Sequence, residues 1–180
     1  MNTSCLQIYT GNGKGKTTAA LGLILRAAGS GLRVYLGQFI KSMEYHEIGI
    51  LRSRFPEVTV ELYGDEGCIV DRDPDPRDIR AAMDGLSRAR AALGSGSYDL
   101  VVLDEIFIPM YFKILSEDDV LSMLREWREK EKAGGFHTEL VLTGRYAPES
   151  ILAQADLITE MKEVRHYYEK GIEARDGIER

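Results

Sequence analysis

Short apolar runs alternate with longer helix-forming segments along this chain of 180 residues. The apolar runs predict strands at 6–9, 32–40, 58–63, 100–103, 139–143 and 157–161. The helix-forming segments predict helices over 16–28, 77–93 and 116–132, and a short helix that begins at 148. The run at 100–103 does not alternate, which is typical of a parallel strand covered on both faces. This order of elements predicts an α/β fold with a mainly parallel central sheet flanked by helices.

Turn and cap residues mark the ends of the predicted helices. Glycine-rich turns at 29–31 and 94–96 end the first two of them. Ser116 precedes three acidic residues, a pattern typical of a capped helix start whose acids face the positive end of the helix dipole. The chain beyond His166 is polar and has no clear period. We find no repeat or linker, so we expect one domain over residues 1–180.

The composition narrows the class of protein. Hydrophobic residues make up 44% of the chain, enough to bury one core. The 29 acidic and 23 basic residues give a net charge of −6, which argues against binding to nucleic acid or to an anionic membrane. Two cysteines, Cys5 and Cys68, are too few for a four-thiolate zinc site. The sequence shows neither an apolar run of about 20 residues nor a signal peptide, so we expect a cytoplasmic protein.

The most informative motif joins the first predicted strand to the first predicted helix. It is a variant of the Walker A loop in which Thr10 replaces the first glycine. Glycines let backbone N–H groups converge on an anion, and the helix start adds positive potential. Lys16 is placed to reach the β- and γ-phosphates, and the Thr17 hydroxyl to bind Mg²⁺. The predicted ATP-binding residues of the loop are Gly11, Asn12, Gly13, Lys14, Gly15, Lys16, Thr17 and Thr18.

The second informative segment is the strand at 100–103, which ends in Asp104 and Glu105. At the carboxyl end of a parallel sheet these carboxylates would face the phosphate loop, where Mg²⁺ needs oxygen ligands. The two motifs together predict a nucleotide held on Mg²⁺, and they leave the reaction type open.

Five segments carry a resemblance to a known family. In chain order they are Thr10-Gly-Asn-Gly-Lys-Gly-Lys-Thr-Thr18, Gln38-Phe-Ile-Lys41, Val102-Leu-Asp-Glu105, Leu142-Thr-Gly-Arg145 and Gly171-Ile-Glu-Ala-Arg-Asp-Gly-Ile-Glu179. The set resembles the ATP:corrinoid adenosyltransferases of cobalamin biosynthesis and salvage. Segments 155–161 and 164–166 extend the similarity to nearly the whole chain. The stretch at 171–179 is the most specific of these segments, because phosphate loops also occur in many other nucleotide-binding proteins.

The resemblance implies a RecA-like P-loop NTPase fold, one nucleotide-binding domain over residues 1–180, and an uncommon use of ATP. In this family a Co(I) corrinoid attacks the 5′ carbon of the ribose, forms a Co–C bond and releases triphosphate. Lys16 and Mg²⁺ would then stabilise a triphosphate leaving group. ATP is thus the implied co-substrate and Mg²⁺ the implied cofactor. The implied partners are the corrinoid, a second copy of the chain in a homodimer, and a reductase that supplies Co(I).

The resemblance also implies roles for individual residues. Lys16 and Glu105 are the predicted catalytic residues. Thr17 and Glu105 are the predicted direct ligands of Mg²⁺. Asp104 is predicted to lie next to these ligands without binding the ion directly.

Two arginines join the predicted ATP site. Arg26, on the helix after the loop, matches a family position close to the nucleotide ribose. Arg145 ends a strand beside the loop, and its planar guanidinium suits a phosphate oxygen.

One segment departs from the family pattern. Family members often carry an aromatic Phe-Thr-Trp-type stretch that packs against the corrin and helps to exclude the lower ligand of cobalt. The corresponding segment here has no aromatic ring, and the predicted corrinoid-proximal residues are Cys68, Ile69 and Val70. The alternative aromatic contacts are Tyr45, Phe107, Tyr111 and Phe112.

Two other classes of function remain open at this level. The phosphate loop and the acidic strand end equally suit a phosphotransferase or an ATPase. The missing aromatic stretch suits a non-catalytic module that binds a nucleotide or a corrinoid. The reaction products separate all three classes.

Overall fold

The structure is a computed structural model that describes residues 3–41, 45–64 and 74–179. Its strands are β1 (Leu6–Thr10), β2 (Val34–Phe39), β3 (Val58–Tyr63), β4 (Leu100–Asp104), β5 (Glu139–Thr143) and β6 (Leu157–Glu160). Its helices are α1 (Lys16–Gly29), α2 (His46–Arg54), α3 (Pro76–Gly94), α4 (Phe107–Tyr111), α5 (Glu117–Lys132) and α6 (Glu149–Leu152), with a 3₁₀ helix at Tyr167–Lys170.

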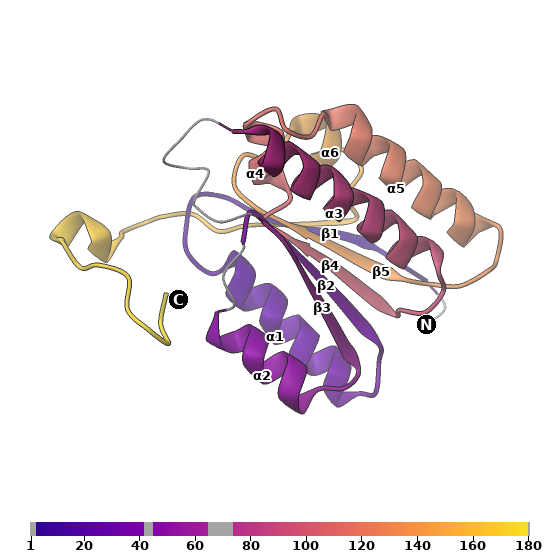
Figure 1. Ribbon diagram of the computed structural model, residues 1–180, viewed down its shortest axis with the longest axis horizontal. Coiled ribbons are helices and arrows are strands. Elements are labelled where there is room, and N and C mark those ends of the chain that lie inside the picture. The colour runs from indigo at the N-terminus through magenta and orange to yellow at the C-terminus, as the bar shows by residue number, and fades with distance from the viewer. Residues whose placement is uncertain (1–2, 42–44, 65–73, 180) are drawn as a thin grey trace.

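The strands form a six-stranded sheet in the order β3-β2-β4-β5-β1-β6. Each neighbouring pair is parallel. Helices α1 and α2 cover one face of the sheet, while α3, α4, α5 and α6 cover the other (Figure 1). All strands therefore end at one edge, on the left in Figure 1, where the first residues of α1 also lie. The predicted α/β fold with a parallel central sheet is confirmed.

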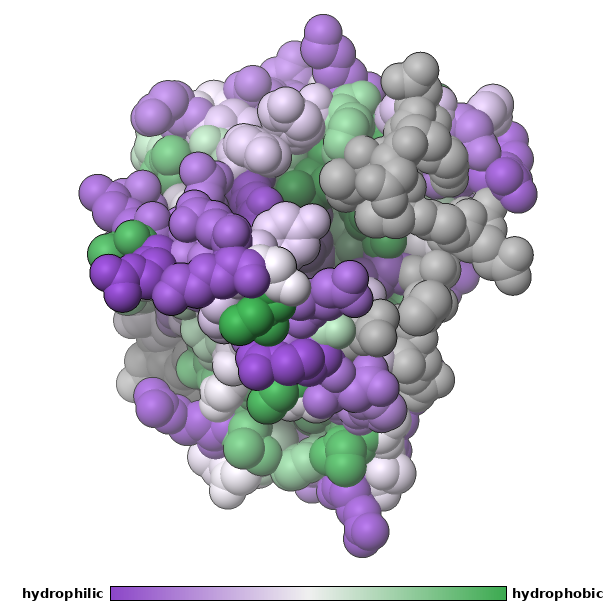
Figure 2. Space-filling view, turned by 90° about the vertical axis from the view of Figure 1, so that its left-hand side faces the viewer, coloured by the Kyte–Doolittle hydropathy of each residue, from purple (hydrophilic) through white to green (hydrophobic). Residues whose placement is uncertain are grey.

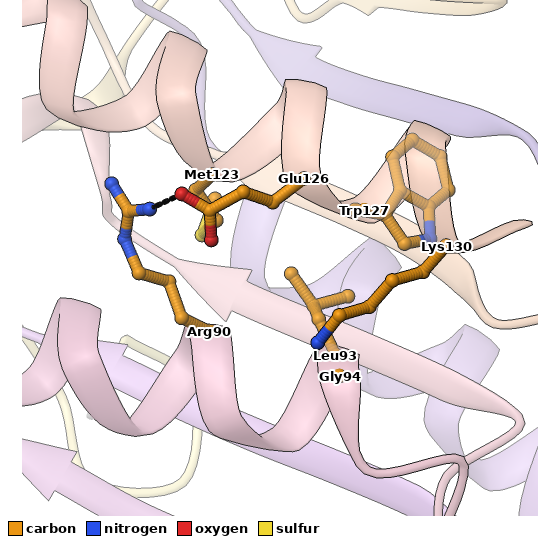
Figure 3. A pocket seen from close by; sticks show the side chains of 7 residues that line it. All are labelled: Arg90, Leu93, Gly94, Met123, Glu126, Trp127 and Lys130. Atoms are coloured by element: carbon orange, nitrogen blue, oxygen red, sulfur yellow. Dashed lines mark hydrogen bonds and ion pairs between the residues drawn. The ribbon is translucent and has the colours of Figure 1, made fainter.

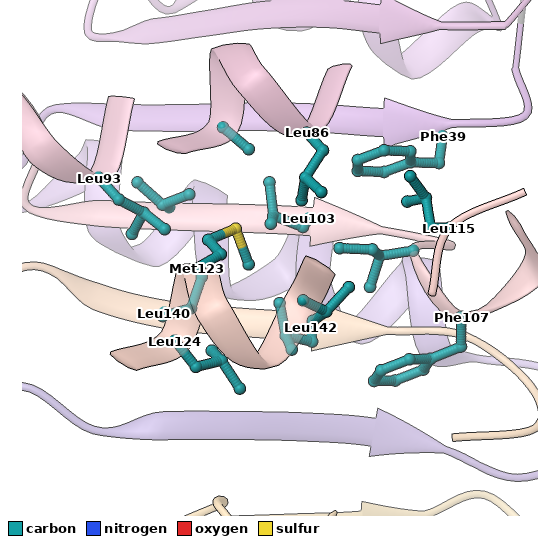
Figure 4. Close-up of a cluster of buried hydrophobic side chains, with 14 of the residues drawn as sticks. Phe39, Leu86, Leu93, Leu103, Phe107, Leu115, Met123, Leu124, Leu140 and Leu142 are labelled. Atoms are coloured by element: carbon teal, nitrogen blue, oxygen red, sulfur yellow. The ribbon is translucent and has the colours of Figure 1, made fainter. Parts of the chain in front are cut away.

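The central strand β4 is buried on both faces, as its unbroken apolar run predicted. Val101 and Leu103 point into the larger core under α3 and α5, whereas Leu100 and Val102 point into the smaller core under α1. Figure 4 shows the larger core, where Leu103 packs among side chains of the helices and of neighbouring strands. Burying one such side chain stabilises the fold by roughly 1.5–3 kcal/mol. The two cores hold the carboxyl ends of β4 and its neighbouring strands in fixed positions, at the end of the sheet where α1 begins.

Two helices start with a capping box, and the one at Ser116 follows the predicted cap residue. The Ser116 hydroxyl accepts the N–H of Asp119, and the Asp119 carboxylate accepts the N–H of Ser116 in return. Asp75 caps α3 in the same way with Asp78. None of the helices among the described residues is long and apolar enough to span a membrane.

Two helices, α2 and α4, were not predicted from the sequence. In α2 only Ile48 and Leu51 are buried, too few apolar positions to establish a helical period. Helix α4 is a five-residue turn that contains Pro109, and it packs into the larger core through Phe107 and Met110. Both helices form because tertiary burial outweighs a weak local signal.

Two hollows on the helical layer lie away from the strand ends. A crevice between α3 and α5, shown in Figure 3 beside the Arg90–Glu126 ion pair, has a volume of about 10 Å³. That volume holds a single water molecule at most. A larger hollow of about 250 Å³ lies between α5 and the start of β1, lined by Leu6 and Trp127 among others. Neither hollow adjoins the phosphate loop.

Candidate active site

The loop between β1 and α1 requires glycine at two points for different reasons. Gly15 has a φ of 122°, in a region that L side chains rarely adopt. A Cβ atom on Gly13 would lie 2.7 Å from the backbone oxygen of Met161. The Gly13 N–H donates to that same oxygen at 2.7 Å. The glycines of the motif thus let the loop pack against the chain that follows β6.

Helix α1 starts without a capping side chain. Its N-cap is Gly15, and its first turn contains no acidic residue. The first N–H groups of a helix have no partner within the helix, so here they face the loop without a side-chain acceptor. Such a helix start attracts an anion, as the sequence predicted for a triphosphate.

Lys16 lies at the centre of the loop and is only 5% exposed. Its Nζ donates to the backbone oxygens of Gly11 at 2.7 Å and Gly13 at 2.9 Å. Burial lowers the pKa of Lys16, while the charges of Glu105 and Asp104 oppose that shift. A partly desolvated ammonium attracts phosphate oxygens more strongly than one in water.

The buried carboxylate of Asp104, the last residue of β4, accepts hydrogen bonds from α1, from β5, and from β2 and the segment just after it. Its hydrogen-bond donors are Thr17 Oγ1 at 3.0 Å, Gln38 Nε2 at 3.0 Å, Lys41 Nζ at 3.1 Å and Thr143 Oγ1 at 2.6 Å. Gln38, Lys41 and Thr143 entered the sequence prediction only as parts of family motifs, and none of them was predicted as a site residue. The signal they share is their position at, or just after, the carboxyl ends of the strands next to β4.

Glu105 occupies a special backbone position beside Asp104. Its φ is 58°, in the left-handed region that is uncommon for a residue with a side chain. Its N–H donates to Thr143 Oγ1 at 3.0 Å, which fixes the turn after β4. Burial and the neighbouring Asp104 raise the pKa of the Glu105 carboxyl, whereas Lys41, Lys16 and Arg145 oppose the shift. The Glu105 carboxylate therefore lies within electrostatic reach of the loop lysine.

The residues at this edge fit Mg²⁺ bound together with phosphate oxygens. Thr17 and Asp104 are in contact, and Glu105 follows directly, so a hydroxyl and two carboxylates are available. The amide oxygen of Gln38 is buried beside them without a hydrogen-bond partner, which leaves an acceptor for a donor such as metal-bound water. The described residues contain no cluster of three or more His, Cys, Asp or Glu side chains that could hold a metal alone. A hard cation here would need oxygens from a nucleotide or water.

The two predicted arginines lie in different places. Arg145 is exposed and follows Gly144, whose N–H donates to the Tyr9 backbone oxygen at 3.1 Å, so Arg145 lies beside the strand that leads into the phosphate loop. Arg26 lies in the last turn of α1, at the opposite end of the helix from the loop. Ten residues of α-helix rise about 15 Å. Within this chain Arg26 therefore lies about 15 Å along the helix from the loop lysine, and its place near the ribose stays a prediction.

The chain after β6 also reaches the phosphate loop. Lys14 Nζ donates to Glu179 Oε1 at 2.7 Å, to the Ile178 backbone oxygen at 2.9 Å and to the Tyr167 hydroxyl at 3.0 Å. Arg175 Nη2 lies 3.1 Å from the same Glu179 oxygen. Hydrogen bonds from Arg175 and Lys14 lower the pKa of Glu179. The segment that resembles the family most specifically is therefore attached to the loop, a contact that the sequence did not predict.

Five predicted site residues remain. Asn12 is exposed in the loop, and Thr18 is exposed in the first turn of α1. Cys68, Ile69 and Val70 lie outside the described residues. Figure 2 looks onto the edge where the strands end, and hydrophilic side chains predominate there, with apolar ones in smaller groups.

The fold and this edge define the class of protein. A glycine-rich loop between β1 and α1, a buried lysine at its centre, and an aspartate at the end of β4 in contact with the first turn of α1 define a phosphate-loop nucleotide-binding protein. Flagellar accessory protein FlaH from Methanocaldococcus jannaschii has a similar fold, with a TM-score of 0.56 and 13% identity over 87% of this chain and 70% of that one. At that identity the likeness concerns the fold alone.

The chain belongs to the ATP:corrinoid adenosyltransferase family. The family model ATP:corrinoid adenosyltransferase BtuR/CobO/CobP matches residues 2–180. A corrinoid adenosyltransferase of Pseudomonas aeruginosa is 35% identical over 97% of this chain and 82% of its own length. Those of Sinorhizobium and Salmonella typhimurium are each 33% identical over 96% of this chain, and over 78% and 83% of their own lengths. The predicted family, and with it a transferase, is confirmed.

Proposed function

We propose that this chain transfers the 5′-deoxyadenosyl group of ATP to the Co(I) of a corrinoid. The cobalt electron pair forms a bond to the 5′ carbon, the bond from that carbon to oxygen breaks, and triphosphate leaves with the bonding electrons. The observation that supports the proposal is the hydrogen bond from Thr17 to Asp104 beside the buried Lys16, in a chain that belongs to the ATP:corrinoid adenosyltransferase family.

Lys16 is the proposed stabiliser of the leaving group. Its ammonium already lies among the backbone oxygens of the loop, at 2.7 Å from Gly11 and 2.9 Å from Gly13. Phosphate oxygens carry a full charge, so they are stronger acceptors than these carbonyls. Charge that develops on the departing triphosphate therefore meets a fixed positive group. Arg145, exposed beside Lys16, adds a second cation for an outer phosphate oxygen.

Thr17, Glu105 and Asp104 are the proposed holders of Mg²⁺. When bound, Mg²⁺ would neutralise part of the charge of the triphosphate. Asp104 already accepts the hydrogen bond of the Thr17 hydroxyl, which holds that hydroxyl at the end of β4. Lys41 and Gln38 both donate hydrogen bonds to the Asp104 carboxylate and hold it in place. A homodimer, a reductase partner and a cytoplasmic location remain predictions from the sequence.

Analysis of the products tests the proposal. The protein is incubated with MgATP and chemically reduced cobalamin, and the products are followed by phosphorus NMR. We expect inorganic triphosphate in step with adenosylated corrinoid, and none when the corrinoid is left out. ADP that accumulates in step with ATP loss would place the chain among phosphotransferases or ATPases instead.

A further inference from the structure

Two exposed tyrosine rings meet beside the phosphate site. Tyr111, from α4, and Tyr146, from the turn after β5, stack with ring centroids 4.2 Å apart and planes inclined by 24°. Tyr111 is 56% exposed and Tyr146 is 50% exposed. Phe112 packs edge-on against Tyr111, with centroids 5.3 Å apart. The pair, named the tyrosine stack below, is thus an ordered aromatic surface that keeps about half of its area open.

The tyrosine stack borders the charged residues of the site. Tyr146 follows Arg145 in the turn after β5, where the Gly144 N–H donates to the backbone oxygen of Tyr9 in β1 at 3.1 Å. Tyr111 lies six residues after Glu105, at the end of the helix that this turn begins. Both rings therefore stand at the carboxyl ends of β4 and β5. In parallel α/β sheets this is the edge at which ligands bind.

The backbone at Tyr146 is held in an unfavourable conformation. Its φ is 64°, and a bulky residue in the left-handed region is a true outlier. Ile40, after β2, and Glu105, after β4, share this feature at the same edge. Strained backbone gathers where a ligand or a reaction requires a particular side-chain position. The half-exposed ring of Tyr146 gains less from burial than a core residue does, so packing in the free protein does not account for the strain.

We propose that the tyrosine stack is the wall on which the corrin ring of the substrate lies. This inference rests on the proposed function and names a contact surface for its second substrate. Cobalt attacks the 5′ carbon from the side opposite the departing triphosphate, so the corrin lies on the far side of that carbon from the phosphates. Its broad apolar face then needs a flat apolar surface of the protein to lie on. Tyr111 follows β4 and Tyr146 follows β5, and β5 is the strand that pairs with β1. The exposed faces of the two stacked rings therefore lie at the same end of the sheet as the phosphate loop and offer a flat surface to a broad disc.

The other aromatic residues named as alternative corrin contacts are less suited to bind a corrin ring. Phe107 is fully buried in the larger core, and Phe112 is half-buried behind Tyr111. The Tyr45 ring lies under the Lys41 ammonium, 5.5 Å from its centroid. Tyr111 combines exposure with a stacked partner from a second strand end. Tyr146 was not singled out in the sequence, because nothing local pairs it with a ring 35 positions earlier.

Binding measurements on the whole protein test the wall. Affinity for oxidised cobalamin is measured by fluorescence quenching, and affinity for MgATP by calorimetry, so that neither value depends on turnover. For the double variant Tyr111→Ala with Tyr146→Gly we expect corrinoid affinity to fall about tenfold. We expect MgATP affinity to stay within about twofold, and the double Tyr→Phe variant, which keeps both rings, to bind like the wild type. Ile50→Ala, which trims a side chain that is 56% exposed on α2, is the matched control and should change neither affinity.

The outcomes separate this inference from the proposed function. Unchanged corrinoid affinity in the double variant would overturn the inference that the tyrosine stack contacts the corrin ring. Loss of MgATP affinity alone would assign the rings to the adenine base and also overturn it. If the wild type binds cobalamin more tightly than the double variant but releases ADP, the tyrosine stack still binds the corrin ring and adenosyl transfer is rejected. If the double variant fails to fold, Tyr146→Gly alone carries the test, because glycine accepts the left-handed backbone.

Discussion

The Thr17 hydroxyl donates to the buried Asp104 carboxylate at 3.0 Å, which joins the first turn of α1 to the end of β4. The two residues are 87 positions apart, and they meet because the sheet places β4 two strands from β1. The hydrogen bond sets the hydroxyl that follows the loop lysine against the acidic strand end. Both halves of the predicted phosphate and metal site therefore meet in one place.

Lys16→Ala should weaken MgATP binding by at least about tenfold and nearly abolish turnover, because it removes a desolvated cation from the phosphates. Calorimetry measures the binding. Lys132→Ala, at the exposed end of α5, removes the same charge away from the site and is the matched control. Wild-type affinity in Lys16→Ala would show that the loop does not bind the phosphates.

Thr17→Ala should chiefly raise the Mg²⁺ concentration required for half-maximal activity, because it removes an oxygen ligand and leaves the loop cation in place. Asp104→Asn should do the same and should also lower the melting temperature. The neutral amide leaves the Lys41 ammonium, 3.1 Å away, without its counter-charge. A magnesium titration at saturating ATP measures the first effect, and thermal unfolding the second. An unchanged magnesium requirement in both variants would contradict the metal site.

Glu179→Gln should release the chain end from Lys14. Arg175 and Lys14 lower the pKa of Glu179, so the ion pair stabilises the fold fully above the ordinary glutamate value of 4.5. That contribution declines below 4.5 and is lost as pH falls through the lowered pKa. Limited trypsin digestion at neutral pH should cleave the segment that follows residue 165 faster in the variant than in the wild type. Glu173→Gln, in the same segment, is the matched control. Equal cleavage of wild type and Glu179→Gln would show that this ion pair does not hold the segment.

Ser116→Ala should lower the free energy of unfolding by about 1 kcal/mol, because the Asp119 N–H loses its acceptor at the start of α5. Urea unfolding measures the change. Ser87→Ala, at an exposed interior position of α3, is the control and should be neutral or slightly stabilising. A loss in Ser87→Ala as large as that in Ser116→Ala would contradict the capping role.

The sequence by itself determined the local elements and the chemistry of the loop. Strand and helix positions follow from apolar periodicity, and the loop follows from glycines that only a tight turn around an anion requires. The acidic end of β4 was also readable, because an apolar run that ends in two carboxylates is a local feature. Helices α2 and α4 were not readable, since their stability depends on burial rather than on their own pattern.

Only the tertiary structure decided which side chains meet. Gln38, Asp104 and Thr143 come together because β2, β4 and β5 are neighbours in the sheet although they are far apart in the chain. Arg26 shares a helix with Lys16, yet the rise of that helix carries it away from the loop. Lys14 and Glu179 are 165 positions apart, and no local pattern encodes their contact. Periodicity reports what surrounds a residue, whereas strand order and the path of the chain fix its partners.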